Sequence, residues 1–205
     1  MAPRSRTTLP LVEPVVPLLR GIPFDDPARL FEPKYDRFRG LLYVSPRQCW
    51  FRSKRGNTMT RFQELAEQVR DELRVRDAIL DGEIVSLDEQ GRHIFRRMLA
   101  GRGHLHYAAF DLLWLNGRDL RPQPLTRRKQ RLERLVPTTT PALSRIFSVV
   151  GRGRDMLGAA EQLDLEGIVA KRKADPYAPE TTWYKIKNKA YTQSEGCWKL
   201  FNRNA

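Results

Sequence analysis

The chain has 205 residues, 40% hydrophobic and 30% charged, which allows one domain with a sizeable core and argues against intrinsic disorder. Lys and Arg outnumber Asp and Glu by 37 to 24, and the net charge of +13 favours a nucleic acid over an anionic membrane surface as partner. The apolar run 9–19 contains three prolines and a glutamate, which exclude a signal-peptide core or a membrane-spanning helix. We therefore expect a cytoplasmic protein without a membrane partner.

In chain order, the sequence predicts a Pro-rich arm over residues 1–23, a domain over 24–188 and a short tail over 189–205. Regular structure is expected to begin near Leu30. Short runs of β-branched and aromatic residues predict strands, and apolar residues three or four positions apart predict helices. The predicted strands cover 41–44, 49–52, 78–87, 146–150, 168–171 and 183–187, and the predicted helices cover 61–73, 124–135 and 155–163.

Three regions of the sequence carry more specific signals. Asn116-Gly117 separates two apolar runs within 104–120 and predicts a hairpin. The helix 124–135 is rich in Lys and Arg, so it either tracks a phosphate backbone or forms a solvated face. One face of the helix 61–73 is apolar, with Phe62, Leu65, Val69 and Leu73.

Because strands and helices mix without a strict βαβ alternation, the predicted fold class is α+β with antiparallel sheets.

The residues that carry chemistry fall in five short segments. These are FEPKYDRFRG (31–40), LDGEIV (80–85), AFDLL (109–113), LEGIVAKR (165–172) and WYKIKN (183–188). Alone, the Lys34-x-Asp36 pattern of the first is typical of a solvated ion pair. Together and in this order, the segments resemble the motifs of the adenylation (nucleotidyltransferase) domain of ATP-dependent DNA ligases, above all bacterial end-joining ligases. The resemblance covers about residues 17–188.

This resemblance implies a fold and a reaction. The fold is an ATP-grasp-like nucleotidyltransferase fold, in which antiparallel sheets are flanked by helices, with residues 24–188 as the adenylation domain. Lys34 is the nucleophile that takes AMP from ATP in the presence of Mg²⁺. AMP then passes to a 5′-phosphate of nicked or broken double-stranded DNA, and a 3′-hydroxyl seals the strand in repair or recombination.

Lysine chemistry explains why further cations belong in such a site. An attacking amine must be deprotonated, and a lysine in water has a pKa of about 10.4. Neighbouring positive charges and a divalent metal favour the neutral amine and also stabilise a transferring phosphoryl group. By resemblance, Lys185 and Lys187 are the catalytic partners of Lys34, and their spacing puts both on one face of a strand.

The resemblance also assigns the nucleotide and metal contacts. Glu32 binds the adenine amino group, Phe110 stacks on the ring, and Lys171 adds to the positive field. Glu83 and Glu166 lie near the ribose and the metal, since Mg²⁺ prefers one or two carboxylates together with phosphate oxygens and waters.

Several positions concern the phosphates or depart from the family pattern. Arg39 holds the nucleotide or a DNA phosphate. Lys54 stands where a second arginine is expected, which keeps the charge but loses the bidentate fork. Arg37 stands where the family usually has glycine, so it either crowds the pocket or points outward to bind phosphate. Relatives usually carry an OB-fold after the last lysine motif, and the tail 189–205 is too short for one.

These departures leave three hypotheses open. The first is an ATP-dependent DNA ligase-type adenylyltransferase, acting alone or with a separate OB-fold or end-joining protein. The second is a catalytically degenerate ligase domain that binds DNA without chemistry. The third is a relative of RNA ligases or of GTP-using capping enzymes.

Overall fold

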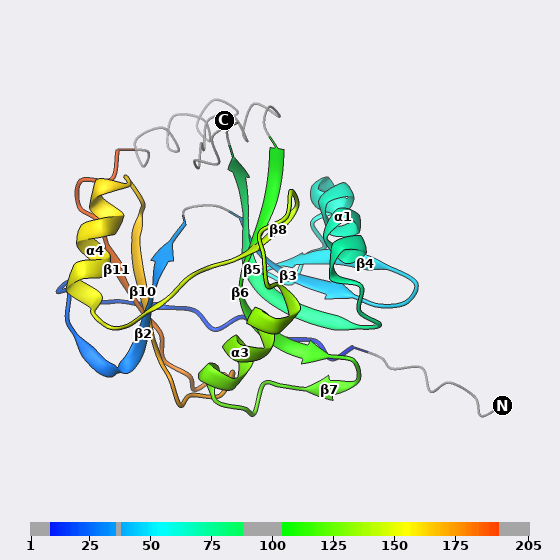
Figure 1. The fold of residues 1–205 in the computed structure, drawn as a ribbon, viewed down its shortest axis with the longest axis horizontal. Coiled ribbons are helices and arrows are strands. Elements are labelled where there is room, and N and C mark those ends of the chain that lie inside the picture. Colours follow the sequence, from blue (N-terminus) through cyan, green and yellow to red (C-terminus); the bar gives the residue numbers. More distant parts are fainter. Residues whose placement is uncertain (1–8, 36–37, 88–103, 193–205) are drawn as a thin grey trace.

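The computed structural model describes residues 9–35, 38–87 and 104–192, which form two β-sheets with three helices around them (Figure 1). Sheet A contains β1 (Leu18–Leu19), β11 (Tyr184–Lys187), β10 (Gly167–Arg172), β2 (Asp26–Lys34) and β9 (Val149–Gly151), in that order. Sheet B contains β4 (Cys49–Ser53), β3 (Phe38–Val44), β5 (Ala78–Leu87), β6 (His104–Leu115) and β7 (Arg118–Asp119), with β8 (Leu143–Arg145) beside β6. The helices are α1 (Gln63–Leu73, after a 3-10 turn at Thr60–Phe62), α3 (Leu125–Leu135) and α4 (Gly153–Gln162).

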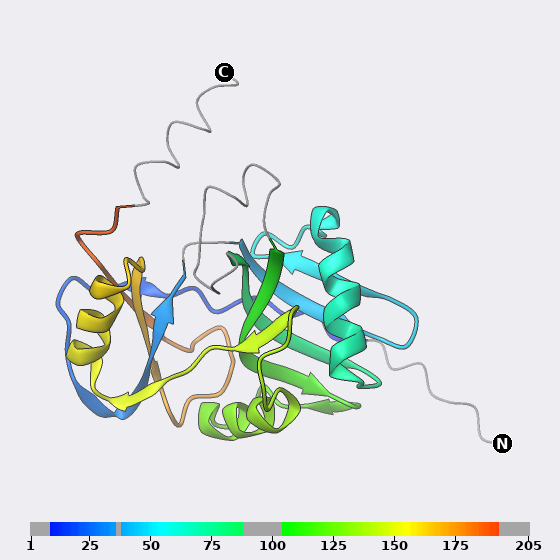
Figure 2. The same cartoon turned by 45° about the horizontal axis from the view of Figure 1, so that its top comes forward.

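Side-chain alternation divides sheet A into two faces. Phe31 of β2 is fully buried and packs with Ile168 of β10 and Met156 of α4. Glu32 and Lys34 lie at alternate positions of the same strand and face the other way. Helix α4 therefore covers the outer face of sheet A (Figure 2). The inner face carries Glu32 and Lys34, which share a cavity with residues of sheet B.

Sheet B has an apolar core on the face away from sheet A. The apolar stripe predicted on the helix 61–73 is confirmed, because its four residues are buried in this core. Helix α3 adds Leu132 to the same core, beside Leu112 of β6. Packing of this face against the helices holds sheet B in place. Its opposite face, toward sheet A, is the one that can line a site.

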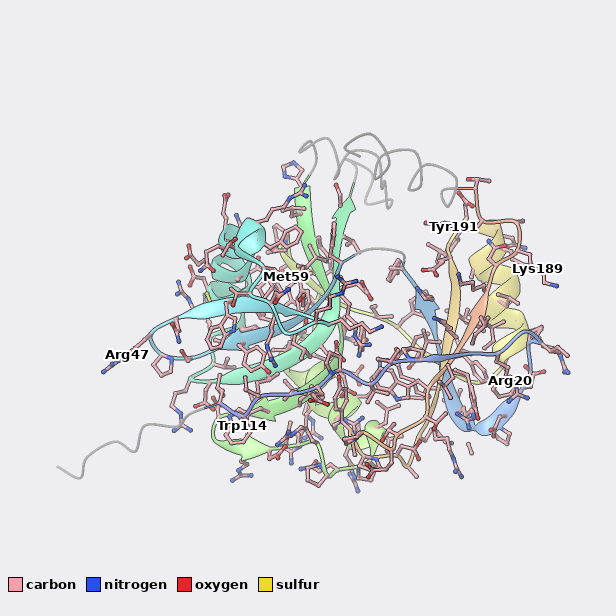
Figure 3. The ribbon with its side chains drawn as sticks, turned by 180° about the vertical axis from the view of Figure 1, so that it is seen from behind. Arg20, Arg47, Met59, Trp114, Lys189 and Tyr191 are labelled. Carbon is pink, nitrogen blue, oxygen red and sulfur yellow. The ribbon has the colours of Figure 1, made fainter. Side chains whose placement is uncertain are left out.

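The segment 9–23 runs in an extended path across both sheets (Figure 3). Val12 and Val15 are 2% and 4% exposed and join an apolar cluster with Phe110 and Trp183. The Val12 N–H donates to the Tyr43 hydroxyl at 3.0 Å, and β1 pairs in parallel with β11. In its described part, the predicted arm is thus packed onto the domain and helps to join the sheets.

The predicted α+β class with antiparallel sheets is confirmed by the strand pairing, apart from the short parallel pairs β1–β11 and β6–β8. Regular structure begins before Leu30, because β1 lies at Leu18–Leu19 and β2 starts at Asp26. The strand predicted at 146–150 is correct only at its end: β9 of sheet A covers Val149–Gly151, and β8 of sheet B already ends at Arg145, so residues 146–148 connect the two sheets. Within the described ranges, no helix is long and apolar enough to cross a membrane.

Candidate active site

The inner face of sheet A aligns the predicted lysines in rows. In one row Lys34 of β2 pairs with Gly167 of β10, which pairs with Lys187 of β11. In the next row Glu32 pairs with Val169, which pairs with Lys185. Because strand neighbours in register point to the same side, these charged side chains share one face. Three segments far apart in the sequence therefore meet on one surface.

Gly167 allows these strands to approach closely. Its φ is +145°, a conformation that side chains other than glycine rarely adopt, and an added Cβ would clash with the carbonyl oxygen of Ile186. Just before this glycine, Glu166 forms an ion pair with the Nζ of Lys34. The Lys34 side chain is 22% exposed and that of Glu166 is 13% exposed, so this pair remains within reach of solvent.

Sheet B supplies the facing wall. Arg39 of β3 pairs in register with Glu83 of β5, and Phe110 lies on the neighbouring strand β6. A cavity of about 190 Å³ opens between the two walls. Its lining residues from sheet A, sheet B and the N-terminal segment are Val16, Pro17, Glu32, Pro33, Lys34, Tyr35, Arg39, Lys54, Glu83, Phe110, Ile146, Val169, Lys171, Trp183 and Lys185.

Eight of the ten predicted site residues line this cavity: Glu32, Lys34, Arg39, Lys54, Glu83, Phe110, Lys171 and Lys185. The other two are close to it on sheet A. Glu166 is paired with Lys34, and Lys187 lies in register with Lys34 at an exposed position of β11. Arg37 lies outside the described residues. The structure thus brings the predicted site residues together, and their individual roles remain predictions.

Arg39 is held by buried partners. Two of its guanidinium nitrogens donate to the Asp81 carboxylate at 3.0 and 2.6 Å, and a third donates to the Val15 carbonyl at 2.6 Å. Burial opposes the charge on Arg39, but Asp81 raises its pKa above the ordinary value. Tyr177 also donates its hydroxyl to Asp81 at 2.7 Å. A nucleotide or DNA phosphate would therefore meet an arginine already fixed by protein partners.

A second buried cluster surrounds Glu32. Its carboxylate forms ion pairs with Lys171, at 2.6 Å, and with Lys129 of α3. Burial alone would raise the pKa of Glu32, but the two lysines lower it below its usual value. Burial lowers the pKa of Lys171, whose ammonium lies 3.9 Å from the centre of the Phe110 ring. Glu32 is therefore held as a carboxylate at the cavity wall.

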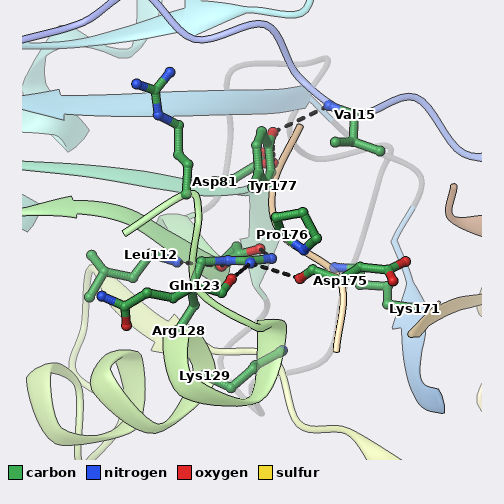
Figure 4. A network of polar contacts seen from close by, with 12 residues as sticks. Val15, Asp81, Leu112, Gln123, Arg128, Lys129, Lys171, Asp175, Pro176 and Tyr177 are labelled. Carbon is green, nitrogen blue, oxygen red and sulfur yellow. Dashed lines mark hydrogen bonds and ion pairs between the residues drawn. The ribbon is translucent and has the colours of Figure 1, made fainter. Parts of the chain in front are cut away.

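The sequence interpretation missed Lys129, which forms an ion pair with the cavity residue Glu32. The basic helix was expected to face DNA or solvent, which is wrong for two of its cations. Arg128 is fully buried and forms a two-pronged ion pair with buried Asp111, at 2.8 and 3.0 Å. Figure 4 shows Arg128 between α3 and the loop at Asp175, whose carbonyl accepts from it at 3.0 Å. The helical period could have indicated an inward face through Leu125 and Leu132, but not the partners of its charges.

The carboxylates fit a magnesium ion only in part. Burial raises the pKa of Glu83 to about 8, and its Oε2 atom is buried without a hydrogen-bond partner among the described residues. No group of three or more His, Cys, Asp or Glu side chains in the described ranges could hold a metal by itself. Mg²⁺ uses one or two carboxylates with phosphate oxygens and waters, and Glu83 and Glu166 remain the predicted carboxylates.

Among the residues that the structure describes, the two histidines on β6 belong to no metal-binding group. Both ring nitrogens of buried His106 are engaged, by the Pro141 carbonyl at 3.0 Å and the Ser144 hydroxyl at 2.7 Å. His104 is exposed at the start of the strand.

The fold and the lysine-rich cavity define the class, a nucleotidyltransferase domain of the ATP-dependent ligase type. The structure is similar to that of mycobacterial DNA ligase D complexed with ATP and MES, with TM-score 0.70 and 28% identity over 85% of this chain and 60% of that chain. It also matches Chlorella virus DNA ligase-adenylate, with TM-score 0.53 and 14% identity over 84% of this chain and 69% of that chain, which supports the fold alone.

A family model of the ATP dependent DNA ligase domain matches residues 23–187, so the chain belongs to this family. The sequence is 30% identical to DNA ligase C1 of Mycolicibacterium smegmatis, over 83% of this chain and 55% of the relative. It is also 30% identical to the multifunctional non-homologous end joining protein LigD of Pseudomonas aeruginosa, over 90% of this chain and 23% of the relative. The chain thus spans about half of the first relative and a quarter of the second, and the family inferred from the motifs is confirmed.

Proposed function

We propose that this chain transfers AMP from ATP to Lys34 and then to a 5′-phosphate of nicked or broken double-stranded DNA, for strand joining. One observation carries the proposal. The Nζ atom of Lys34 lies at the cavity, paired with Glu166, on the same sheet face as Lys185 and Lys187. The names of the similar proteins, a DNA ligase and an end-joining protein, support the same chemistry and a role in DNA repair.

In the first step Lys34 acts as the nucleophile. Its ammonium gives a proton to solvent, the ion pair with Glu166 breaks, and the amine lone pair forms a bond to the α-phosphorus while the bond to pyrophosphate breaks. Lys185 and Lys187 stabilise the negative charge on the phosphoryl oxygens. In the second step an oxygen of the DNA 5′-phosphate attacks the same phosphorus, and the amine of Lys34 leaves and is restored.

The other cavity residues would hold the nucleotide and the metal. Phe110 offers an apolar ring to the base, and Glu32 with Lys171 offers an acceptor and a donor beside it. Glu83 and Glu166 would hold Mg²⁺, which when bound neutralises phosphate charge. Lys54 and Arg39 complete the basic lining at the sheet B wall.

Covalent labelling tests this proposal. The protein is incubated with Mg²⁺ and ATP labelled on the α-phosphate and then run on a denaturing gel. We expect label on the wild-type chain and on Lys189→Ala, an exposed lysine outside the cavity (Figure 3), and none on Lys34→Ala. A blank wild-type lane at high protein and Mg²⁺ concentrations would refute the proposal.

The degenerate binding module is the second candidate, favoured by the net charge of +13 and by Arg37 at the glycine position. It predicts DNA binding that weakens steeply with salt and is unchanged in Lys34→Ala. Labelling that appears only in Arg37→Gly would favour this candidate. Competition between ATP and GTP, and between DNA and RNA nicks, separates both candidates from an RNA ligase or capping relative.

The proposed setting is the cytoplasm, on nucleoid DNA if the source is a bacterium, with a separate OB-fold or end-joining protein as partner. Adding such a protein should raise the sealing of a nicked duplex without changing the labelling of Lys34. Sealing that is equal with and without it would remove the partner from the proposal.

A further inference from the structure

Lys129 makes an unusual contact for a residue of a basic surface helix. It reaches from α3 to Glu32 of β2, which is only 2% exposed and already paired with Lys171. Two ammonium groups thus share one buried carboxylate, and the cluster keeps a surplus positive charge at the cavity wall. Lys171 alone would neutralise Glu32. Burying a second lysine beside it costs additional desolvation free energy that neutralisation does not require.

The position of Lys129 is fixed by several contacts of its helix. Its neighbour Arg128 is anchored to Asp111, the residue that follows Phe110 on β6. The first N–H groups of α3 donate to the loop that follows Lys171, from Leu125 to the Asp175 carbonyl at 3.0 Å. Figure 4 shows this helix turn beside the loop, with Arg128 between them. Helix α3 is therefore tied both to β6, which carries Phe110, and to the loop after Lys171. These contacts hold Lys129 beside Glu32.

A charged Glu32 distinguishes nucleobases by their hydrogen-bonding pattern. A carboxylate only accepts hydrogen bonds, so it favours a base with an amino group at position 6 and disfavours one with an oxygen there. A protonated carboxyl could donate to that oxygen, and burial alone pushes Glu32 toward the protonated form. The second lysine opposes this tendency.

We propose that Lys129 is a positioning residue that keeps Glu32 an oriented hydrogen-bond acceptor and thereby makes the cavity select a 6-amino over a 6-oxo purine nucleotide. The inference rests on the proposed function for its setting, but it concerns nucleotide selection and not the covalent step. It assigns to α3 a direct part in specificity.

The test compares ATP with ITP, which carries an oxygen in place of the 6-amino group. For Lys129→Met, we expect the ratio of kcat/KM for labelling with ATP over ITP to fall about tenfold, the weight of one charged hydrogen bond. Lys129→Arg should restore most of the ratio because it keeps the charge. Arg127→Met removes an equal charge from the exposed side of the same helix and should leave the ratio unchanged.

A double-mutant comparison tests whether Lys129 acts on nucleotide selection through Glu32. In a Glu32→Gln background, Lys129→Met should change the ratio by less than about twofold, because the acceptor on which Lys129 acts is gone. Partial misfolding lowers the rates for both nucleotides together and leaves their ratio intact. A wild-type ratio in Lys129→Met, or an equal fall in both backgrounds, would overturn the inference.

Calorimetric binding of ATP and ITP separates this inference from the covalent proposal. If the wild type binds ATP over ITP but no label forms, the covalent proposal fails and the binding ratio of Lys129→Met still tests the inference. If label forms with an unchanged ratio in Lys129→Met, the inference alone fails. Equal binding of the two nucleotides by the wild type, or binding of neither, would remove the selectivity that Lys129 is proposed to set.

Discussion

Two charged pairs, Lys34–Glu166 on sheet A and Asp111–Arg128 between sheet B and helix α3, use their charges in opposite ways. On sheet A, Lys34 forms an ion pair with Glu166, and both side chains are partly exposed. On sheet B, Asp111 and Arg128 are both 0% exposed and joined by two hydrogen bonds. A reactive amine must be able to leave its partner, whereas a buried pair that loses one member leaves an uncompensated charge. Sheet A therefore carries the proposed chemistry, and the polar pairs of sheet B hold the wall that faces it.

The largest effect on activity is expected from a substitution at Lys34 that keeps the positive charge but removes the reactivity of the amine. Lys34→Arg keeps a positive charge beside Glu166, but a guanidinium stays protonated at any working pH. We expect covalent labelling to fall by at least about 10³-fold, while the free energy of unfolding changes by less than about 0.5 kcal/mol. Quantitative gel labelling and urea unfolding measure both. Label that persists on the arginine variant would move the nucleophile to another residue.

The next effect concerns the buried pair of sheet B. Asp111→Asn leaves Arg128 charged and buried, so the free energy of unfolding should fall by about 3 to 5 kcal/mol in urea. The matched control is Asp119→Asn, whose pair with Arg121 is 28% and 33% exposed. Its loss should cost less than about 1 kcal/mol. Equal losses for the two variants would contradict the structural role given to the buried pair.

A smaller effect is expected at the strand contact beneath the lysine rows. Gly167→Ala adds a side chain at a φ of +145° and against the β11 backbone, so it should cost about 2 to 3 kcal/mol and reduce labelling. Gly158→Ala is the control, because its site on α4 is open and alanine favours helix by about 1 kcal/mol. In thermal unfolding, the Tm of Gly167→Ala should lie below that of the wild type and the Tm of Gly158→Ala above it. Similar shifts for both would show that the β10–β11 contact is not tight.

The smallest effect is the pH dependence from buried His106. Burial lowers its pKa below 6.5, with the Pro141 carbonyl and Glu72 partly opposing the shift. Above pH 6.5 both states are neutral, and as the pH falls below 6.5 the unfolded chain binds a proton first. The free energy of unfolding should therefore fall by up to about 1.4 kcal/mol per pH unit below 6.5. His106→Asn should flatten this slope, and an unchanged slope would place the titration elsewhere.

Much of the site could be predicted because its residues lie in short segments whose order is itself informative. Lys34, Glu83, Phe110 and Lys185 were expected from such segments and line one cavity. Lys129 could not be predicted as a site residue. A lysine on a basic helix looks the same in the sequence whether it faces solvent or a buried acid, since its partner Glu32 lies on a distant strand.

The sequence by itself determined the family, the strand and helix periods, and the residue types available for adenylyl transfer, because these depend on local spacing. Only the tertiary structure decided which charges pair, that Arg39 is bound to Asp81 and the Val15 carbonyl, and that β8 and β9, three residues apart, belong to different sheets. Pairing and burial depend on contacts between segments far apart in the chain, and a charged side chain carries no local mark of the partner it will meet.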